Sequence, residues 1–354
     1  MKSIVVIMPS MIGGGSERVL SVLMNSLIKK KYQVVLALIK KDAVIEYNLD
    51  KKIIVEKNEK IGKNKIHNIW LEITYIRHIM NKYATATCIS FISMYNLYTI
   101  IASIGRRVNV IVSERCDPKR SFKKYKNTMD KLRQILYKKA NYVVFQTKEA
   151  SEYFEGLKNT RIIPNPLAND LPEKYNYDDE KIFVAIGRLE EQKNYKMLIQ
   201  AMNIVCDKFP EVKLKIYGKG IKEEELRAYT NSLKYSEQII FEGFTDEIHS
   251  ELLSAYAYIS SSDYEGISNA MLEALAIGVP CICTDCPVGG AREFIEDHVN
   301  GILVKVGDTQ GMANAIIELL EYPNNRECYG NKGKLIRKKI NVDKIVSIWE
   351  TLFE

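Results

Sequence analysis

Short apolar runs alternate with segments of helical period along this chain of 354 residues. The runs suit buried strands, and in the segments between them apolar residues recur every three to four positions. Such alternation predicts an α/β fold built on a doubly wound parallel sheet. In the first half, strands are predicted at 4–8, 32–39, 53–55, 88–92, 109–113 and 142–146, and helices at 16–30, 66–83, 97–104 and 125–140.

The length and a break in this pattern predict two domains. Residues 168–180 are acidic, rich in Tyr and Asn and without periodicity, whereas residues 181–186 begin a second series of strands that includes 214–217 and 279–283. We expect an N-terminal domain over 1–168, a C-terminal domain over 169–335 and a final helix within 336–354.

Composition indicates a globular protein of a reducing compartment. Apolar residues make up 46% and charged residues 27%, and the seven cysteines, an odd number, favour free thiols over a disulfide framework. Cys281, Cys283 and Cys286 lie close together, but no second Cys or His pair accompanies them, which favours burial along a strand over a metal site. Residues 84–105 carry no charge; their polar residues favour a strand, a loop and a helix over a membrane span.

Charge is shared unevenly between the two halves. Residues 1–174 hold 31 Lys and Arg against 15 Asp and Glu, whereas residues 175–354 hold 20 against 29. A basic first half suggests an anionic partner, for which nucleic acid, an anionic membrane face and a phosphorylated acceptor all qualify.

The stretch 263–290 carries two glutamates eight residues apart. Ser268 or Asn269 can cap a helix that ends at Gly278, which puts Glu265 in the loop before the helix and Glu273 on its second turn. A helix start offers N–H groups and a positive dipole end to an anion. A capped helix with two solvated glutamates is the alternative interpretation.

Three further motifs follow predicted strands. Gly13, Gly14 and Gly15 form a strand–loop–helix unit of the kind that lets a backbone approach a phosphate. Residues 113–118, Ser-Glu-Arg-Cys-Asp-Pro, lie at a strand's carboxyl end, where an Asx-type turn before Pro118 is the structural alternative. Residues 187–194 read Gly-Arg-Leu-Glu-Glu-Gln-Lys-Asn and carry two cations.

In this order, the motifs resemble those of retaining glycosyltransferases of family 4, the group 1 glycosyltransferases. The matching residues are the E-x7-E pair Glu265 and Glu273, Gly14-Gly15-x-Glu17-Arg18, Gly187-Arg188-Leu189-x-x-x-Lys193-Asn194 and the Pro-Asn linker 164–165. The resemblance implies the GT-B fold, in which two Rossmann-like domains face a cleft. It also implies that the final helix crosses back onto the N-terminal, acceptor-binding domain.

The resemblance further implies transfer of a hexose or N-acetylhexosamine from a nucleotide-diphosphate sugar, with UDP expected, in polysaccharide biosynthesis. Arg188 and Lys193 would hold the diphosphate, Glu265 the donor sugar and Glu273 the ribose, and the first two with Glu265 form the expected catalytic set. No Asp-x-Asp motif is present, so we expect no metal and no cofactor. Further donor-binding residues are expected at Gly14, Gly15, Gly187, Gly218, Phe244, Gly266, Ile267, Ser268 and Asn269.

The acceptor side departs from the family pattern because no histidine falls at 113–118. That motif resembles instead the Ser-x-Arg-x-Asp-Pro pattern of bacterial enzymes that extend lipid-linked oligosaccharides. A basic segment follows it, with an apolar face expected from Leu132, Ile135 and Leu136. This segment is either a solvated charge run or a contact surface for a polyprenyl-diphosphate-linked acceptor. In the second case we expect a cytoplasmic protein that contacts the anionic inner face of the membrane. Acceptor residues are expected at Glu114, Arg115, Asp117, Lys119, Arg120, Lys123 and Lys124.

Two other functions remain as alternatives at this point. The missing histidine would suit a non-catalytic sugar-nucleotide-binding subunit of a glycosyltransferase complex. The basic half alone would suit nucleic-acid binding, which we rank last because the strong motifs lie in the acidic half.

Overall fold

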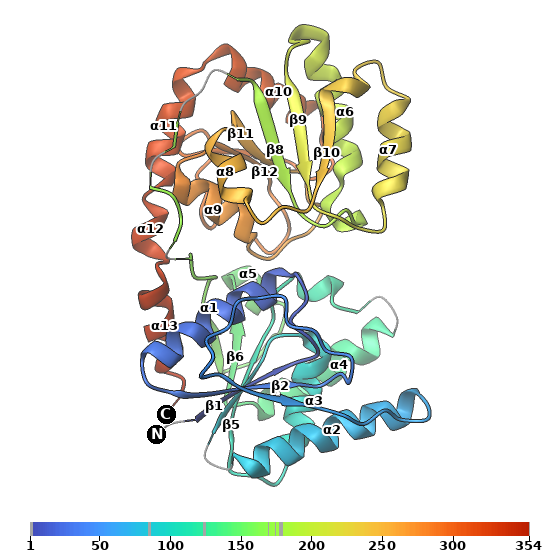
Figure 1. Cartoon of the computed structure of the whole chain (residues 1–354), viewed down its shortest axis with the longest axis vertical. Coiled ribbons are helices and arrows are strands. Elements are labelled where there is room, and N and C mark those ends of the chain that lie inside the picture. Colours follow the sequence, from blue (N-terminus) through green and yellow to red (C-terminus); the bar gives the residue numbers. More distant parts are fainter. Residues whose placement is uncertain are drawn as a thin grey trace. The chain divides into compact units, whose positions relative to one another are not determined.

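The structure, a computed structural model, describes residues 3–83, 86–122, 125–168, 170–173, 175–176 and 180–353. It divides into two compact units (Figure 1). Unit 1 comprises Met1–Ala168 with Ile340–Glu354, and unit 2 comprises Asn169–Lys339. Each unit is a parallel sheet with helices on both faces, which confirms the predicted α/β class.

The sheet of unit 1 has seven strands in the described part of the chain, in the order β3-β2-β1-β4-β5-β6-β7. All of its pairings are parallel; Ile4 of β1, for example, lies between Val34 and Thr87. The strand order reverses beside β1, so ligands are expected at the carboxyl ends of β1 and β4. The strands are β1 (Ser3–Met8), β2 (Gln33–Leu38), β3 (Ile54–Lys57), β4 (Thr87–Ser90), β5 (Asn109–Ser113), β6 (Tyr142–Phe145) and β7 (Thr160–Ile162).

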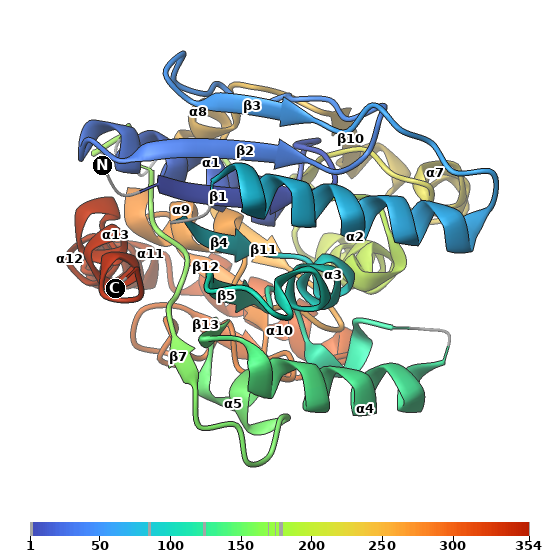
Figure 2. The same ribbon diagram turned by 90° about the horizontal axis from the view of Figure 1, so that it is seen from below.

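The helices of unit 1 cover this sheet. They are α1 (Gly15–Lys29), α2 (Lys65–Lys82), α3 (Ser93–Ser103), α4 (Lys126–Leu136), α5 (Lys148–Glu152) and α13 (Val342–Glu350). Helices α2, α3 and α4 lie side by side (Figure 2), and α13 packs against α1. The buried Trp349 of α13 stacks on Phe91 with 5.5 Å between ring centroids, so this last helix is part of the unit 1 core.

The uncharged stretch after residue 84 forms a buried strand and a helix, as expected, but the helix begins at Ser93 rather than at residue 97. Its first turn is fixed by Asn96, whose buried side chain donates to the Ser113 carbonyl at 2.9 Å. A polar residue that reads as loop in the sequence is therefore a helix residue with a specific partner. No helix in the described residues is long and apolar enough to cross a membrane.

The sheet of unit 2 has six strands among the described residues, in the order β10-β9-β8-β11-β12-β13. Helices α6 and α10 pack together on it, and α9 packs on β11 and β12 and against α11 and α12. The strands are β8 (Ile182–Ile186), β9 (Lys213–Tyr217), β10 (Ile239–Gly243), β11 (Ala257–Ser260), β12 (Cys281–Thr284) and β13 (Ile302–Val304). The helices are α6 (Tyr195–Lys208), α7 (Glu223–Asn231), α8 (Ile248–Leu253), α9 (Asn269–Ile277), α10 (Thr309–Glu321), α11 (Asn324–Gly333) and α12 (Ile336–Lys339).

Candidate active site

Two loops at the carboxyl edge of the unit 2 sheet bring Lys193 and Glu265 into contact. The Lys193 ammonium pairs with Glu265 Oε2, and both side chains are about one fifth exposed, at 17% and 21%. Gln192 Nε2 donates to the Tyr264 carbonyl at 2.9 Å and to Glu265 Oε1 at 3.3 Å. Two predicted catalytic residues that are 72 positions apart in the sequence are therefore neighbours.

The loop after β8 is tied to the loop after β11 by Asn194. This residue adopts a left-handed conformation, with φ of 42°, and its side chain caps α6 by accepting from the Met197 N–H at 3.2 Å. Its Nδ2 donates to Asp263 Oδ1 at 2.7 Å, and Ser261 Oγ donates to the Lys193 carbonyl at 2.8 Å. Each loop thus holds the other, which places Lys193 beside Glu265.

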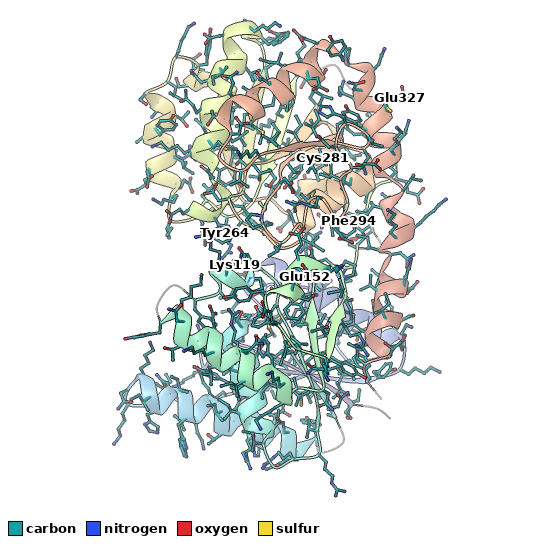
Figure 3. The ribbon with its side chains drawn as sticks, turned by 180° about the vertical axis from the view of Figure 1, so that it is seen from behind. Lys119, Glu152, Tyr264, Cys281, Phe294 and Glu327 are labelled. Carbon is teal, nitrogen blue, oxygen red and sulfur yellow. The ribbon has the colours of Figure 1, made fainter. Side chains whose placement is uncertain are left out.

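Helix α9 starts and ends where the sequence predicts. Ser268 is its N-cap and accepts from the Met271 N–H, and Gly278, with φ of 99°, ends it in the left-handed region. The loop before the helix packs closely on residue 290, because a Cβ on Gly290 would lie 1.6 Å from the Gly266 carbonyl oxygen. The positive end of the helix therefore lies at residues 266–269, next to Glu265 (Figure 3, in which Tyr264 marks this loop).

Glu273 lies on the second turn of α9 and is only 4% exposed. Its Oε2 is 3.2 Å from His249 Nε2, which comes from the separate helix α8. A buried carboxylate needs such a partner, since desolvation without one is costly. Sequence reasoning missed His249, because no spacing pattern links two residues 24 positions apart on different helices.

Arg188 is placed differently from Lys193. Its side chain is 62% exposed, and its Nη1 lies 3.2 Å from Glu190 Oε1. The neighbouring backbone is tightly packed, because a Cβ on Gly218 would lie 2.0 Å from the Gly187 carbonyl oxygen. Phe244, another expected donor residue, is also exposed on the loop after β10. Arg188, expected at the diphosphate, and Phe244, expected at the base, are thus both at the surface of unit 2.

The glycine loop of unit 1 uses some of its amides internally. The Gly13 N–H donates to Glu46 Oε2 at 2.7 Å, and the Gly14 N–H donates to the Tyr47 hydroxyl at 2.9 Å. Burial raises the pKa of Tyr47, whose hydroxyl in turn donates to the Gly14 carbonyl. Gly15 begins α1. These two amides would have to exchange partners to bind a phosphate.

Residues 113–118 enclose a buried polar network. Glu114 is 1% exposed and Arg133 0%, with 3.3 Å between Arg133 Nη1 and Glu114 Oε1. The Tyr137 hydroxyl donates to the same Glu114 oxygen, and burial raises its pKa. Asp117 is buried and accepts from the Lys119 N–H at 2.9 Å, which confirms the Asx-type turn before Pro118. Glu114 and Asp117 are thus engaged inside unit 1.

Arg115 stands apart from this network. Its guanidinium lies over the Phe91 ring, 4.3 Å from the centroid, and its Nη1 donates to the Ile163 carbonyl at 3.3 Å. Among the described residues its Nε and Nη2 atoms are buried without a hydrogen-bond partner, and burial lowers its pKa to about 9. A buried cation with unused donors is suited to an anion.

The basic segment is only partly as expected. Lys119 and Arg120 are exposed, whereas Lys123 and Lys124 lie outside the described residues. Of the expected apolar face, Leu132 and Ile135 are exposed, at 37% and 59%, whereas Leu136 is buried. Arg133 lies on the buried face with Leu136, where its Nη groups contact Glu114, Asp130 and the Pro118 carbonyl and its guanidinium lies over aromatic rings.

The cysteines near the site are buried free thiols. Cys281 and Cys283 lie in β12, Cys281 being labelled in Figure 3, and burial raises the pKa of both. Burial also raises the pKa of Cys286 to about 12, and its thiol donates to the Ser262 carbonyl at 2.9 Å. In the described part of the chain, no group of three or more His, Cys, Asp and Glu side chains is placed to hold a metal ion.

Comparison with known proteins identifies the C-terminal part of the chain. Residues 168–335 match the family described as glycosyl transferases group 1. This segment therefore carries the domain of that family. The protein is a glycosyltransferase of a retaining hexosyltransferase family, as expected.

Two curated glycosyltransferases and one solved structure illustrate the likeness. An uncharacterized glycosyltransferase of Methanocaldococcus jannaschii is 28% identical over 72% of this chain and 74% of its own. The N-acetylgalactosamine-N,N'-diacetylbacillosaminyl-diphospho-undecaprenol 4-alpha-N-acetylgalactosaminyltransferase of Campylobacter jejuni is 27% identical over 72% of each chain. Anabaena HepE, solved in complex with UDP-glucose, superposes with a TM-score of 0.82 at 18% identity over 99% of each chain. That last likeness confirms the GT-B fold.

The buried pair in unit 1 makes a first prediction about this glycosyltransferase. Replacing Arg133 by Met leaves Glu114 buried without its cation, so we expect unit 1 to lose about 3–5 kcal/mol of unfolding free energy. Both tryptophans of the chain, Trp70 and Trp349, lie in unit 1, so urea unfolding followed by tryptophan fluorescence reports on this unit alone.

The exposed Arg161 provides the matched control for that prediction. Arg161→Met should change the unfolding free energy by about 0.5 kcal/mol or less. Adding Glu114→Gln to Arg133→Met should restore part of the loss, because the unpaired charge is removed. If Arg133→Met and Arg161→Met unfold alike, the buried pair does not stabilise unit 1.

Proposed function

We propose that this enzyme transfers a hexose or N-acetylhexosamine from a UDP-sugar to a glycan acceptor carried on a polyprenyl diphosphate, with retention of anomeric configuration. The observation that carries the proposal is the contact of Lys193 with Glu265 beside the start of α9, the helix that also holds Glu273. UDP-glucose bound to the similar HepE supports the donor class, and the name of the Campylobacter relative supports the lipid-linked acceptor.

In this proposal unit 2 binds the donor. Lys193, Arg188 and the start of α9 supply positive charge for the diphosphate, which leaves as negative charge builds on it. Glu265 accepts hydrogen bonds from hydroxyl groups of the sugar, and Glu273 accepts hydrogen bonds from hydroxyl groups of the ribose. The pairing of Lys193 with Glu265 holds both side chains in place, so the ammonium group needs only to share its contacts with the diphosphate.

The remaining donor contacts are proposed from the backbone around these residues. Gly187 and Gly218 allow the two loops to approach, Gly266, Ile267, Ser268 and Asn269 form the helix start, and Phe244 offers an exposed ring to the base. Gly14 and Gly15 are proposed at the diphosphate, although the Gly14 N–H is bonded to Tyr47 here.

Unit 1 is proposed to bind the acceptor. Arg115 supports this because its buried guanidinium has donors to spare, and Lys119 and Arg120 are exposed nearby in sequence. Glu114 and Asp117 are bonded inside the unit, so we assign them the role of shaping this loop. Helix α4 exposes Leu132 and Ile135 among lysines, a combination that suits contact with an anionic membrane face from the cytoplasmic side.

A second prediction concerns Glu273. The Glu273→Gln substitution should raise the KM for the donor more than it lowers kcat, because an amide accepts hydrogen bonds at one oxygen and a carboxylate at two. The ribose contact is alike in ground and transition states, so the loss is one of uniform binding. Calorimetry with UDP is the direct measurement, and an unchanged UDP affinity would remove Glu273 from the ribose site.

A third prediction concerns the basic segment. Changing Lys119, Arg120, Lys123 and Lys124 together to Gln should abolish binding to anionic vesicles and transfer to a lipid-linked acceptor, since each cation contributes about 1 kcal/mol at such a surface. Donor hydrolysis should survive because unit 2 is unchanged. Co-sedimentation beside both activity assays makes the comparison; unchanged sedimentation and transfer would place the acceptor elsewhere.

The proposed function is tested by incubating the enzyme with a panel of UDP-hexoses and UDP-N-acetylhexosamines and a polyprenyl-diphosphate glycan. We expect one donor to give a longer lipid-linked glycan, with the anomeric configuration of the donor retained in its NMR spectrum. A product of inverted configuration, or transfer only to free sugars, would contradict the proposal.

A further inference from the structure

Unit 1 contains a pocket of about 610 Å³ at the amino ends of β5 and β6. It is lined by the connection from α3 to β5, residues 103–110, and by residues 139 and 141 just before β6. The glycine loop and residues 113–118 follow the carboxyl ends of their strands, at the opposite edge of this sheet. The pocket therefore shares no residue with the candidate active site.

Three cations line this pocket: Arg106, Arg107 and Lys139. No carboxylate is among its lining residues. Arg107 and Lys139 are exposed, and among the residues that the structure describes neither forms an ion pair or a hydrogen bond through its side chain. Cations gathered in a concave wall repel one another and attract an anion.

Two of the donor groups are held in fixed orientations by the fold. Arg106 Nε donates to Asn81 Oδ1 at 2.8 Å, which orients the guanidinium and leaves its two Nη groups for another acceptor. Asn141 Oδ1 accepts from the Val110 N–H at 2.8 Å, so the amide cannot flip and its Nδ2 remains a donor. Side chains fixed in this way lose less entropy when they bind a ligand.

We propose that this pocket binds a phosphate group, held by Arg106, Arg107, Lys139 and the Asn141 amide. Arginine forks and ammonium groups are the side chains that phosphate recognition uses most. The pocket volume falls within the range of about 300–1,000 Å³ of small-molecule sites, so it has room for a group attached to the phosphate. That group belongs either to a soluble phosphate compound or to an anionic lipid headgroup, and Ile104, an exposed apolar residue on the pocket wall, suits the latter.

The variant Arg107→Gln/Lys139→Gln tests the site because both side chains are exposed and their loss leaves no buried group unpaired. The control is Lys57→Gln/Lys60→Gln, the same charge change at exposed residues in and just after the edge strand β3. Titration of the full-length enzyme with inorganic pyrophosphate should show two classes of site, one of them the donor site. We expect the pocket variant to weaken only the other class, by about tenfold or more, with an unchanged affinity for UDP.

Vesicles distinguish the two sources of the phosphate. Co-sedimentation is compared on phosphatidylglycerol–phosphatidylcholine vesicles and on phosphatidylcholine alone. If the pocket variant binds the anionic vesicles about tenfold or more weakly than the control, the ligand is a lipid headgroup. If only its pyrophosphate site is lost, the ligand is soluble. If the pocket variant matches the control in both experiments, the proposal is wrong, whatever the outcome for the donor and acceptor sites.

Discussion

Replacing Glu265 by Gln is expected to lower kcat for sugar transfer by about 10²–10³, the loss typical of one group that stabilises a transition state. Glutamine keeps the shape of the side chain, and its one carbonyl oxygen can still accept from Gln192. Ser262 Oγ, which donates to Oε2 in the wild type, can accept from the new amide N–H instead. What is lost is the negative charge beside Lys193 and beside the reacting sugar. We therefore expect the KM for the donor to change much less than kcat.

Glu191 offers the control for this substitution, because it is an exposed glutamate in the 3₁₀ turn Glu191–Lys193 next to the same pair. Glu191→Gln changes the net charge equally and should leave kcat within about twofold. Steady-state kinetics with the preferred donor makes the comparison. Equal rates for the Glu265 and Glu191 variants would show that Glu265 has no part in the chemistry.

The substitutions Lys193→Ala and Arg188→Ala should each lower kcat/KM by about 10²–10³, because each removes a cation from the leaving diphosphate. Lys213, exposed at the start of β9, is the control, and its replacement by Ala should leave the rate unchanged. Near-wild-type rates in both variants would end the diphosphate assignment.

Lys193 and Glu265 touch, so their effects should not be independent. The double variant Lys193→Ala/Glu265→Gln is expected to lose less than the product of the two single losses, as residues that act as a unit do. Arg188 pairs with Glu190 instead, so its effect should multiply with that of Glu265. A double-mutant cycle thus checks whether the contact seen in the structure operates during turnover.

Local signals in the sequence were sufficient to predict most of the fold. The cap at Ser268, the left-handed Gly278 and the span of β5 follow from residue type and short-range pattern. The strands β7 and β13 were not predicted, because three residues are too few to show a pattern of alternating or continuous apolar positions. They complete their sheets through pairing with longer neighbours, which is a tertiary effect.

Some residues of the candidate site were predicted and others were not, because contacts between distant parts of the chain leave no local pattern in the sequence. Spacing predicted that Glu265 lies in the loop before α9 and Glu273 on its second turn. It could not show that Lys193 would pair with Glu265 or that His249 would face Glu273. The burial of Arg133 on helix α4 was not predicted, because arginine is usually exposed. Its burial is tolerated because Glu114, which follows the neighbouring strand β5, supplies the opposite charge.

Release of UDP from a UDP-sugar in the absence of acceptor tests the central assignment most directly. The purified enzyme should hydrolyse its preferred donor slowly, and Lys193→Ala and Glu265→Gln should each reduce that rate by about 10²–10³, whereas Lys213→Ala and Glu191→Gln should not. If the enzyme hydrolyses the donor and the Lys193 and Glu265 variants do so at the wild-type rate, the reaction does not take place at the Lys193–Glu265 pair.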